Sequence, residues 1–173
     1  HLSIRRQRQM CIRDSSDIIF GDQNEWEVAS GVPHIPFEAL DENYEIDKEA
    51  YLEYFRKMHK LFPKCKKMVM AVRNQIASSH HTLSGLLYDS QEDKLYSTRI
   101  YDIQPIIDPM GVGDAFVAAY IHAHQKWGDE NQYCLDFSLS ASAIKNTIPG
   151  DQNLVSEEEI IHNMTSSGGR IQR

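Results

Sequence analysis

The chain has 173 residues, of which 41% are hydrophobic and 25% are charged, and its formal net charge is −7. This composition is typical of one globular domain with its own core, and it excludes a fibrous or disordered chain. The acidic balance, without a basic stripe along the body of the chain, argues against nucleic-acid binding. No apolar run approaches the roughly 20 residues that a membrane span needs, so we expect a cytoplasmic protein without a membrane partner.

The first fifteen residues, HLSIRRQRQMCIRDS, differ from everything that follows them. Arginines are concentrated there without helical or strand periodicity, whereas the later sequence is acidic and regularly patterned. We interpret residues 1–15 as a non-native or disordered segment and place the start of the fold near Ser16. A basic targeting arm is the alternative interpretation.

Strand and helix patterns alternate along the rest of the chain. Short apolar runs bounded by turn residues predict buried strands, and apolar side chains at helical spacing predict amphipathic helices. Asp47 is a candidate N-cap for one such helix, and Pro63 ends it. The predicted strands are 17–21, 66–72, and a hairpin of 84–89 with 94–102; the predicted helices are 46–63, 114–127, 132–147 and 157–164. This order predicts a layered α/β domain.

A glycine-containing turn precedes the helix predicted at residue 114. The strand-like segment 104–108 leads into Gly111 and Gly113, and the helix follows directly. Unpaired amides at a helix start point outward, and the aligned peptide dipoles favour negative charge, so this turn can bind a phosphate. Asp114 lies at the same place, where its carboxylate can accept a proton from a hydroxyl. The alternative is a tight turn in which Asp114 only caps the helix.

The segment 108–116, DPMGVGDAF, resembles the DTxGAGDxF signature of the PfkB-type, ribokinase-like carbohydrate kinases. The resemblance implies a ribokinase-like three-layer α/β/α fold, ATP as phosphate donor, and Mg²⁺. It also implies that Gly111, Val112 and Gly113 form the anion hole for the transferring phosphate and that Asp114 is the base. Other phosphate motifs are absent from the sequence, because there is no GxxxxGK[ST] loop and Phe116 replaces the last glycine of GxGxxG.

A second segment, residues 16–32, resembles the part of that family in which an NxxE motif organises magnesium and phosphate through water. Asp22 stands where asparagine is usual, and Glu25 follows three residues later. The resemblance therefore implies that these two carboxylates are metal ligands through water. The alternative is an exposed helix start.

Two further segments, 70–89 and 143–160, are similar to the 2-dehydro-3-deoxygluconokinase branch of the family. Arg73 is either a ligand of nucleotide phosphates or an exposed loop charge. The resemblance places Asp108, Asn146, Gly150 and Asn153 in the nucleotide site, and the alternative for Gly150 is a simple chain turn. We expect two histidines without metal-ligand spacing, His80 and His81, to be surface loop residues.

The resemblance covers residues 16–173 and implies the C-terminal nucleotide-binding and catalytic part of a kinase domain, without the N-terminal half and lid. The expected reaction is ATP-dependent phosphorylation of a sugar hydroxyl, with 2-dehydro-3-deoxy-D-gluconate converted to its 6-phosphate. The alternatives are another sugar kinase of the fructokinase or ribokinase type, or a nucleotide-binding chain without turnover. The resemblance allows a homo-oligomer of the full-length protein.

Overall fold

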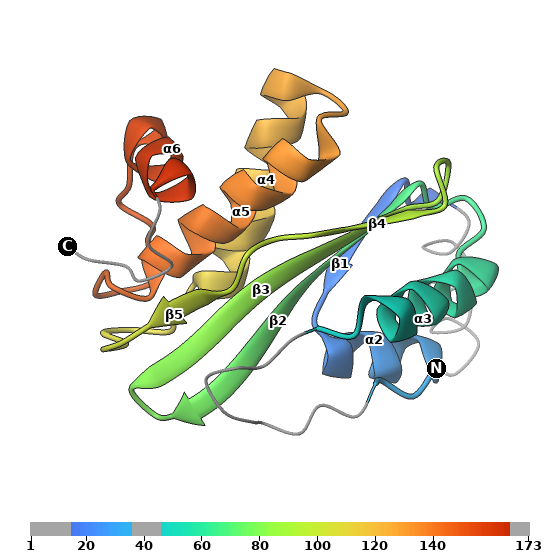
Figure 1. Ribbon diagram of the computed structural model, residues 1–173, viewed down its shortest axis with the longest axis horizontal. Helices are drawn as coiled ribbons and strands as arrows, with labels where there is room; N and C mark the ends of the chain where they lie inside the picture. Colours follow the sequence, from blue (N-terminus) through green and yellow to red (C-terminus); the bar gives the residue numbers. More distant parts are fainter. Residues whose placement is uncertain (1–14, 36–45, 167–173) are drawn as a thin grey trace, which may run out of the picture. The chain divides into compact units, whose positions relative to one another are not determined.

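The computed structural model describes residues 15–35 and 46–166 (Figure 1). Nearly all of the segment predicted to be non-native, residues 1–14, lies outside the described residues, so that interpretation stays a prediction. The described residues form two compact units, the first comprising residues 15–35, 46–70 and 87–95, and the second residues 71–86 and 96–166. No helix in the described ranges is long and apolar enough to cross a membrane.

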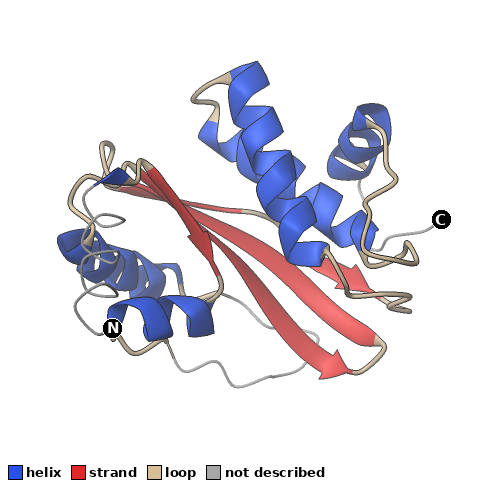
Figure 2. Ribbon diagram, turned by 180° about the vertical axis from the view of Figure 1, so that it is seen from behind, coloured by secondary structure: helices blue, strands red, loops and turns tan. Residues whose placement is uncertain are grey.

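Five strands form one mixed sheet, seen in red in Figure 2. The strands are β1 (Ile18–Gly21), β2 (Lys67–Ala77), β3 (His80–Asp89), β4 (Lys94–Ser97) and β5 (Tyr101–Ile103). They are ordered β1-β2-β3-β4, and β5 pairs with β3. β1 is parallel to β2, with Ile18 opposite Lys67, whereas β5 is antiparallel to β3, with His81 opposite Ile103. The predicted β3–β4 hairpin is confirmed.

Within residues 15–35 and 46–61, the first unit contains the helices α2 (Gln23–Ser30) and α3 (Lys48–Leu61). The predicted cap of α3 is confirmed, because the Asp47 carboxylate accepts the amide N–H of Ala50 at 3.0 Å. An aromatic cluster forms the core of this unit. Phe55 of α3 is fully buried and lies edge-on to Trp26 and stacked on Tyr88, with ring centroids 5.4 and 5.9 Å apart.

The second unit contains the helices α4 (Val112–Trp127), α5 (Asn131–Lys145) and α6 (Glu157–Thr165). All three correspond to predicted helices. Serines of α5 connect it to both neighbours, because Ser138 Oγ donates to the Phe116 carbonyl at 2.5 Å and Ser140 Oγ donates to the Ile160 carbonyl at 2.9 Å. α5 is therefore the helix against which the start of α4 is held.

Two expectations about the strands were wrong. β2 continues to Ala77 and β3 begins at His80, so the segment expected to be a loop is a hairpin with a two-residue turn at 78–79. Conversely, the strand-like segment 104–108 has no strand, and β5 ends at Ile103. Pro105 lacks the amide N–H that a ladder bond requires, which explains the early end. The predicted α/β class is confirmed.

Candidate functional site

The glycine turn before α4 requires glycine at its first position. Gly111 is the N-cap of α4 and has a φ of +74°, in the left-handed region that side chains disfavour. A Cβ atom at Gly111 would lie 2.2 Å from the carbonyl oxygen of Asp151, well inside van der Waals contact. The helix begins at Val112, two residues earlier than predicted, so Gly113 and Asp114 belong to its first turn.

Three amides at the start of α4 are unpaired. The first amide bonded to the helix is that of Ala115, which donates to the Gly111 carbonyl at 2.9 Å. Within the described part of the chain, the amides of Val112, Gly113 and Asp114 have no acceptor, and no side chain caps them. A Cβ built on Gly113 has no atom within 4 Å, so this turn opens to free space. Such a set of donors, with the positive end of the helix dipole, suits a phosphate.

Asp114 is exposed in the same first turn. Among the described residues its carboxylate has no hydrogen-bond partner, so both oxygens remain available to an incoming hydroxyl. The structure therefore brings one free carboxylate and three free amides together in a single helical turn. The sequence analysis expected this arrangement, and the phosphate-binding and catalytic roles of these residues stay predictions.

Asp108 connects the glycine turn to a second turn at residues 149–151. Its Oδ1 accepts the amide N–H of Met110 and its Oδ2 accepts the amide N–H of Gly150, both at 2.9 Å. These two bonds, aided by the charge of Lys145, hold the pKa of the Asp108 carboxyl below its usual range. Both oxygens are used within the protein, so Asp108 shapes the site rather than pointing a free carboxylate into it.

The other predicted nucleotide residues lie around these turns. The Asn146 carbonyl accepts the amides of Ile107 at 2.8 Å and Asp108 at 3.2 Å, while its buried side chain donates to the Ser142 carbonyl. The side chain of Asn153 donates to the Ala141 carbonyl at 3.2 Å. Gly150 turns the chain with a φ of +83°. The role of these residues in a nucleotide site stays a prediction.

Two supporting residues on α5 were missed by the sequence analysis. Ser142 Oγ donates to the carbonyl of Val112 at 3.0 Å, which fixes the first residue of α4. Lys145 is completely buried, and its ammonium donates to the carbonyls of Ile148 at 3.0 Å and Asp108 at 3.4 Å. The available signal was a run of serines and one lysine in an otherwise apolar helix, LDFSLSASAIK.

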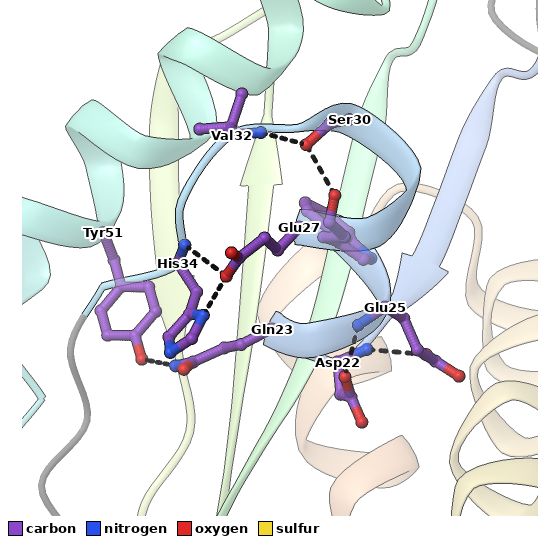
Figure 3. Close-up of polar contacts among 9 residues, drawn as sticks. Asp22, Gln23, Glu25, Glu27, Ser30, Val32, His34 and Tyr51 are labelled. Carbon is purple, nitrogen blue, oxygen red and sulfur yellow. Dashed lines mark hydrogen bonds and ion pairs between the residues drawn. The ribbon is translucent and has the colours of Figure 1, made fainter.

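Asp22 and Glu25 form a capping box at the start of α2, as Figure 3 shows. Asp22 Oδ1 accepts the amide of Glu25 at 2.8 Å, and Glu25 Oε2 accepts the amide of Asp22 at 2.9 Å. The structure thus has the exposed helix start that was the alternative interpretation. The second oxygen of each exposed carboxylate is not used in the capping box. Such an oxygen can accept a hydrogen bond from a water molecule bound to magnesium. No group of three or more metal-ligating side chains occurs in residues 15–35 and 46–166.

The expectations for Arg73 and the two histidines need correction. Arg73 is exposed but lies on β2 rather than in a loop, and its binding to nucleotide phosphates stays a prediction. His81 is only 4% exposed on β3, and burial followed by the charge of Arg73 lowers its pKa. His80 Nε2 lies 2.6 Å from the Asp102 carboxylate, so it is also part of the sheet. The sequence carried no clear strand signal in the second half of β2, because the polar Asn74 is buried whereas the apolar Ile76 is exposed.

Comparisons with known proteins identify the fold. No protein-family model and no curated protein matches the sequence. A solved 2-dehydro-3-deoxygluconokinase from Thermotoga maritima matches with a TM-score of 0.76 and 23% identity, over 91% of this chain and 44% of the other. A PfkB family carbohydrate kinase from Listeria grayi matches with a TM-score of 0.73 and 23% identity, over 96% and 46%.

A ribokinase from Thermotoga maritima is also similar, with a TM-score of 0.54 and 19% identity over 87% of this chain and 42% of the other. The chain therefore spans less than half the length of these proteins. Similarity at this identity concerns the fold. The chain has the ribokinase-like α/β fold that these PfkB-type carbohydrate kinases share, which confirms the predicted fold class.

Proposed function

We propose that the turn from Gly111 to Asp114 is the phosphoryl-transfer site of an ATP-dependent carbohydrate kinase. The observation that carries this proposal is the presence of three unpaired amides and an unpaired carboxylate in the first turn of α4. Asp114 is the third residue of α4 and therefore corresponds to Glu25 of α2, whose carboxylate accepts the amide N–H of the N-cap residue. Among the described residues the Asp114 carboxylate makes no such capping bond, so it remains available to a ligand. The fold shared with sugar kinases supports the same assignment.

In this proposal the amides of Val112, Gly113 and Asp114 donate to oxygens of the transferring phosphoryl group. The Asp114 carboxylate orients the sugar hydroxyl and accepts its proton as the hydroxyl oxygen attacks phosphorus. A loose transition state needs orientation and charge neutralisation more than early proton removal, so a carboxylate at a helix N-terminus is an adequate base. A well-placed base of this kind contributes roughly 10²–10⁴ in rate.

ATP and magnesium fit the donor set that the chain offers. Unpaired amides beside exposed Gly113 suit phosphate oxygens, and Arg73 supplies an exposed cation for the same ligand class. A separate proposal, supported by the resemblance of residues 16–32, is that Asp22 and Glu25 of the first unit bind the water shell of magnesium through their remaining oxygens. Magnesium, when bound, would supply positive charge there.

The proposed substrate is 2-dehydro-3-deoxy-D-gluconate, phosphorylated at its 6-hydroxyl. The similarity to the Thermotoga maritima structure of that name supports this choice over a fructokinase or ribokinase activity, because the ribokinase comparison has a lower TM-score, 0.54 against 0.76. Since the chain spans under half of those proteins, binding of ATP and turnover of the sugar are two separate questions. The second candidate function is nucleotide binding without turnover of the sugar.

The decisive test compares Asp114→Asn with the wild-type chain. We expect Asp114→Asn to retain affinity for ATP with magnesium, measured by calorimetry, and to lose phosphorylation of the keto-acid sugar by about 10²-fold or more. Glu158→Gln is a matched control, because it removes an exposed carboxylate from the first turn of a different helix, α6. Near-normal turnover in Asp114→Asn removes Asp114 as the base. ATP binding by a wild-type chain without turnover identifies the second candidate.

A further inference from the structure

Lys145 is an unusual buried charge. It is the last residue of α5 and is 0% exposed. Moving an ammonium out of water costs several kcal/mol unless the protein supplies hydrogen-bond acceptors. Its acceptors are two main-chain carbonyls, those of Ile148 at 3.0 Å and Asp108 at 3.4 Å. Lysine is rarely found fully buried without a functional or pairing reason.

The two carbonyls belong to the two turns that surround the proposed phosphate site. The Asp108 carbonyl precedes the glycine turn, and the Ile148 carbonyl precedes the turn at 149–151. The same turns are joined by the Asp108 carboxylate, which accepts the amides of Met110 and Gly150. They also touch directly, since Gly111 packs against the Asp151 carbonyl.

We infer that Lys145 is a positioning residue that fixes the glycine turn in its phosphate-binding conformation. The Lys145 ammonium donates to the main-chain carbonyl of Asp108. The side-chain carboxylate of Asp108 in turn accepts the amide N–H groups of Met110 and Gly150, one from each turn. Because both the main chain and the side chain of Asp108 are hydrogen-bonded, the backbone at Gly111 is restricted to one conformation. The amides of Val112, Gly113 and Asp114 are thereby presented together, before any ligand arrives.

This inference rests on the proposed function. Lys145 affects ligand binding by ordering the glycine turn, and it does not contact the substrate itself. A purely stabilising role makes a different prediction. If Lys145 only contributed to folding, its replacement by an apolar side chain would shift the unfolding midpoint and leave the ligand affinity of the folded chain unchanged. If it positions the turn, local order at the two turns and anion affinity fall by more than the change in global stability accounts for, because the loss of the ammonium leaves the carbonyls of Asp108 and Ile148 without their donor.

Lys145→Met tests the inference, since methionine keeps most of the unbranched side chain and removes its charge and donors. Lys57→Met is the matched control, because Lys57 is an exposed lysine of α3 and its loss changes the net charge equally. Amide hydrogen exchange of Met110 and Gly150 reports the turn without any ligand. Titration with inorganic phosphate, followed through the amide NMR signals of residues 112–114, reports the proposed site.

We expect Lys145→Met to accelerate exchange at Met110 and Gly150 by about tenfold relative to exchange in the core of α5, and to weaken phosphate binding by about tenfold, while Lys57→Met changes neither. Lys145→Arg, which restores a cation with donors, should recover part of both losses. Unchanged exchange and affinity in Lys145→Met overturn the inference. If wild-type residues 112–114 do not respond to phosphate, the proposed function fails, and the exchange rates alone then decide the role of Lys145.

Discussion

Replacement of Gly111 by alanine should destabilise the chain more than the same replacement at Gly150. Both glycines lie in the left-handed region, with φ values of +74° and +83°. An alanine in that conformation costs about 1–2 kcal/mol relative to glycine, and this cost is common to the two positions. The positions differ in their surroundings, because a Cβ at Gly150 meets nothing within 4 Å, whereas a Cβ at Gly111 meets the Asp151 carbonyl oxygen at 2.2 Å.

The difference between the two variants therefore measures the close approach of the two turns. Ordinary van der Waals contact begins at 3.4 Å, so the Asp151 carbonyl must move by roughly 1 Å to admit the new methyl group. Forcing an extra carbon into a packed site typically costs about 1–3 kcal/mol. We expect Gly150→Ala to lower the free energy of unfolding by about 1–2 kcal/mol, and Gly111→Ala to lower it by about 1–3 kcal/mol more.

Urea unfolding followed by far-UV circular dichroism measures both losses against the wild-type chain. The gain from a stiffer unfolded chain, about 0.4–1 kcal/mol for glycine to alanine, applies to both variants and cancels in the comparison. A shift in midpoint with an unchanged slope would show that the native state is affected. Equal losses in the two variants would refute the reasoning, because they would mean that the turns at 111 and 151 are not in contact.

Two further predictions separate function from stability and test the surface charges. Gly113→Ala should leave the free energy of unfolding unchanged or raise it by up to about 1 kcal/mol, since alanine favours the helix. The same variant should weaken ATP binding about tenfold in calorimetry, because the new methyl group faces the ligand. Undiminished ATP affinity would contradict the proposed site. Arg56 donates to the Asp93 carboxylate and lowers the pKa of Asp93 to about 2. A carboxyl group with a lowered pKa stabilises the fold at pH values above 3.8, its value in the unfolded chain, and this stabilisation is lost as the pH falls toward 2. The urea midpoint of the wild-type chain should therefore fall more steeply over this pH interval than that of Arg56→Gln. Parallel pH profiles would contradict the ion pair.

Local sequence signals predicted the parts of the site that depend on neighbouring residues. The Asp47 cap, the glycine turn and the helix from Val112 to Trp127 all arise from contacts within a few residues. Capping and left-handed glycines follow rules of local backbone geometry, so the sequence is sufficient to find them. The start of α4 was misplaced by two residues because Gly111, not Gly113, carries the positive φ.

Contacts between distant residues were not predictable in the same way. Asp108 meets Gly150 across 42 residues and Lys145 meets Asp108 across 37, and no periodic pattern encodes such pairs. Asp108 therefore appeared to be a free ligand, although both of its oxygens bind main-chain amides. His81 appeared to be a loop residue because its place in β3 depends on strand pairing, in which it lies opposite the distant Ile103.

The central claim is that the amides of Val112, Gly113 and Asp114 bind phosphate groups. The most direct test is a titration of the ¹⁵N-labelled 173-residue chain with ATP and magnesium, followed by amide chemical shifts. The account predicts that these three amides show the largest saturable shifts and that Gly113→Ala weakens the response. Binding of ATP with the largest shifts elsewhere, for example at the start of α6, and no response at residues 112–114 would contradict it.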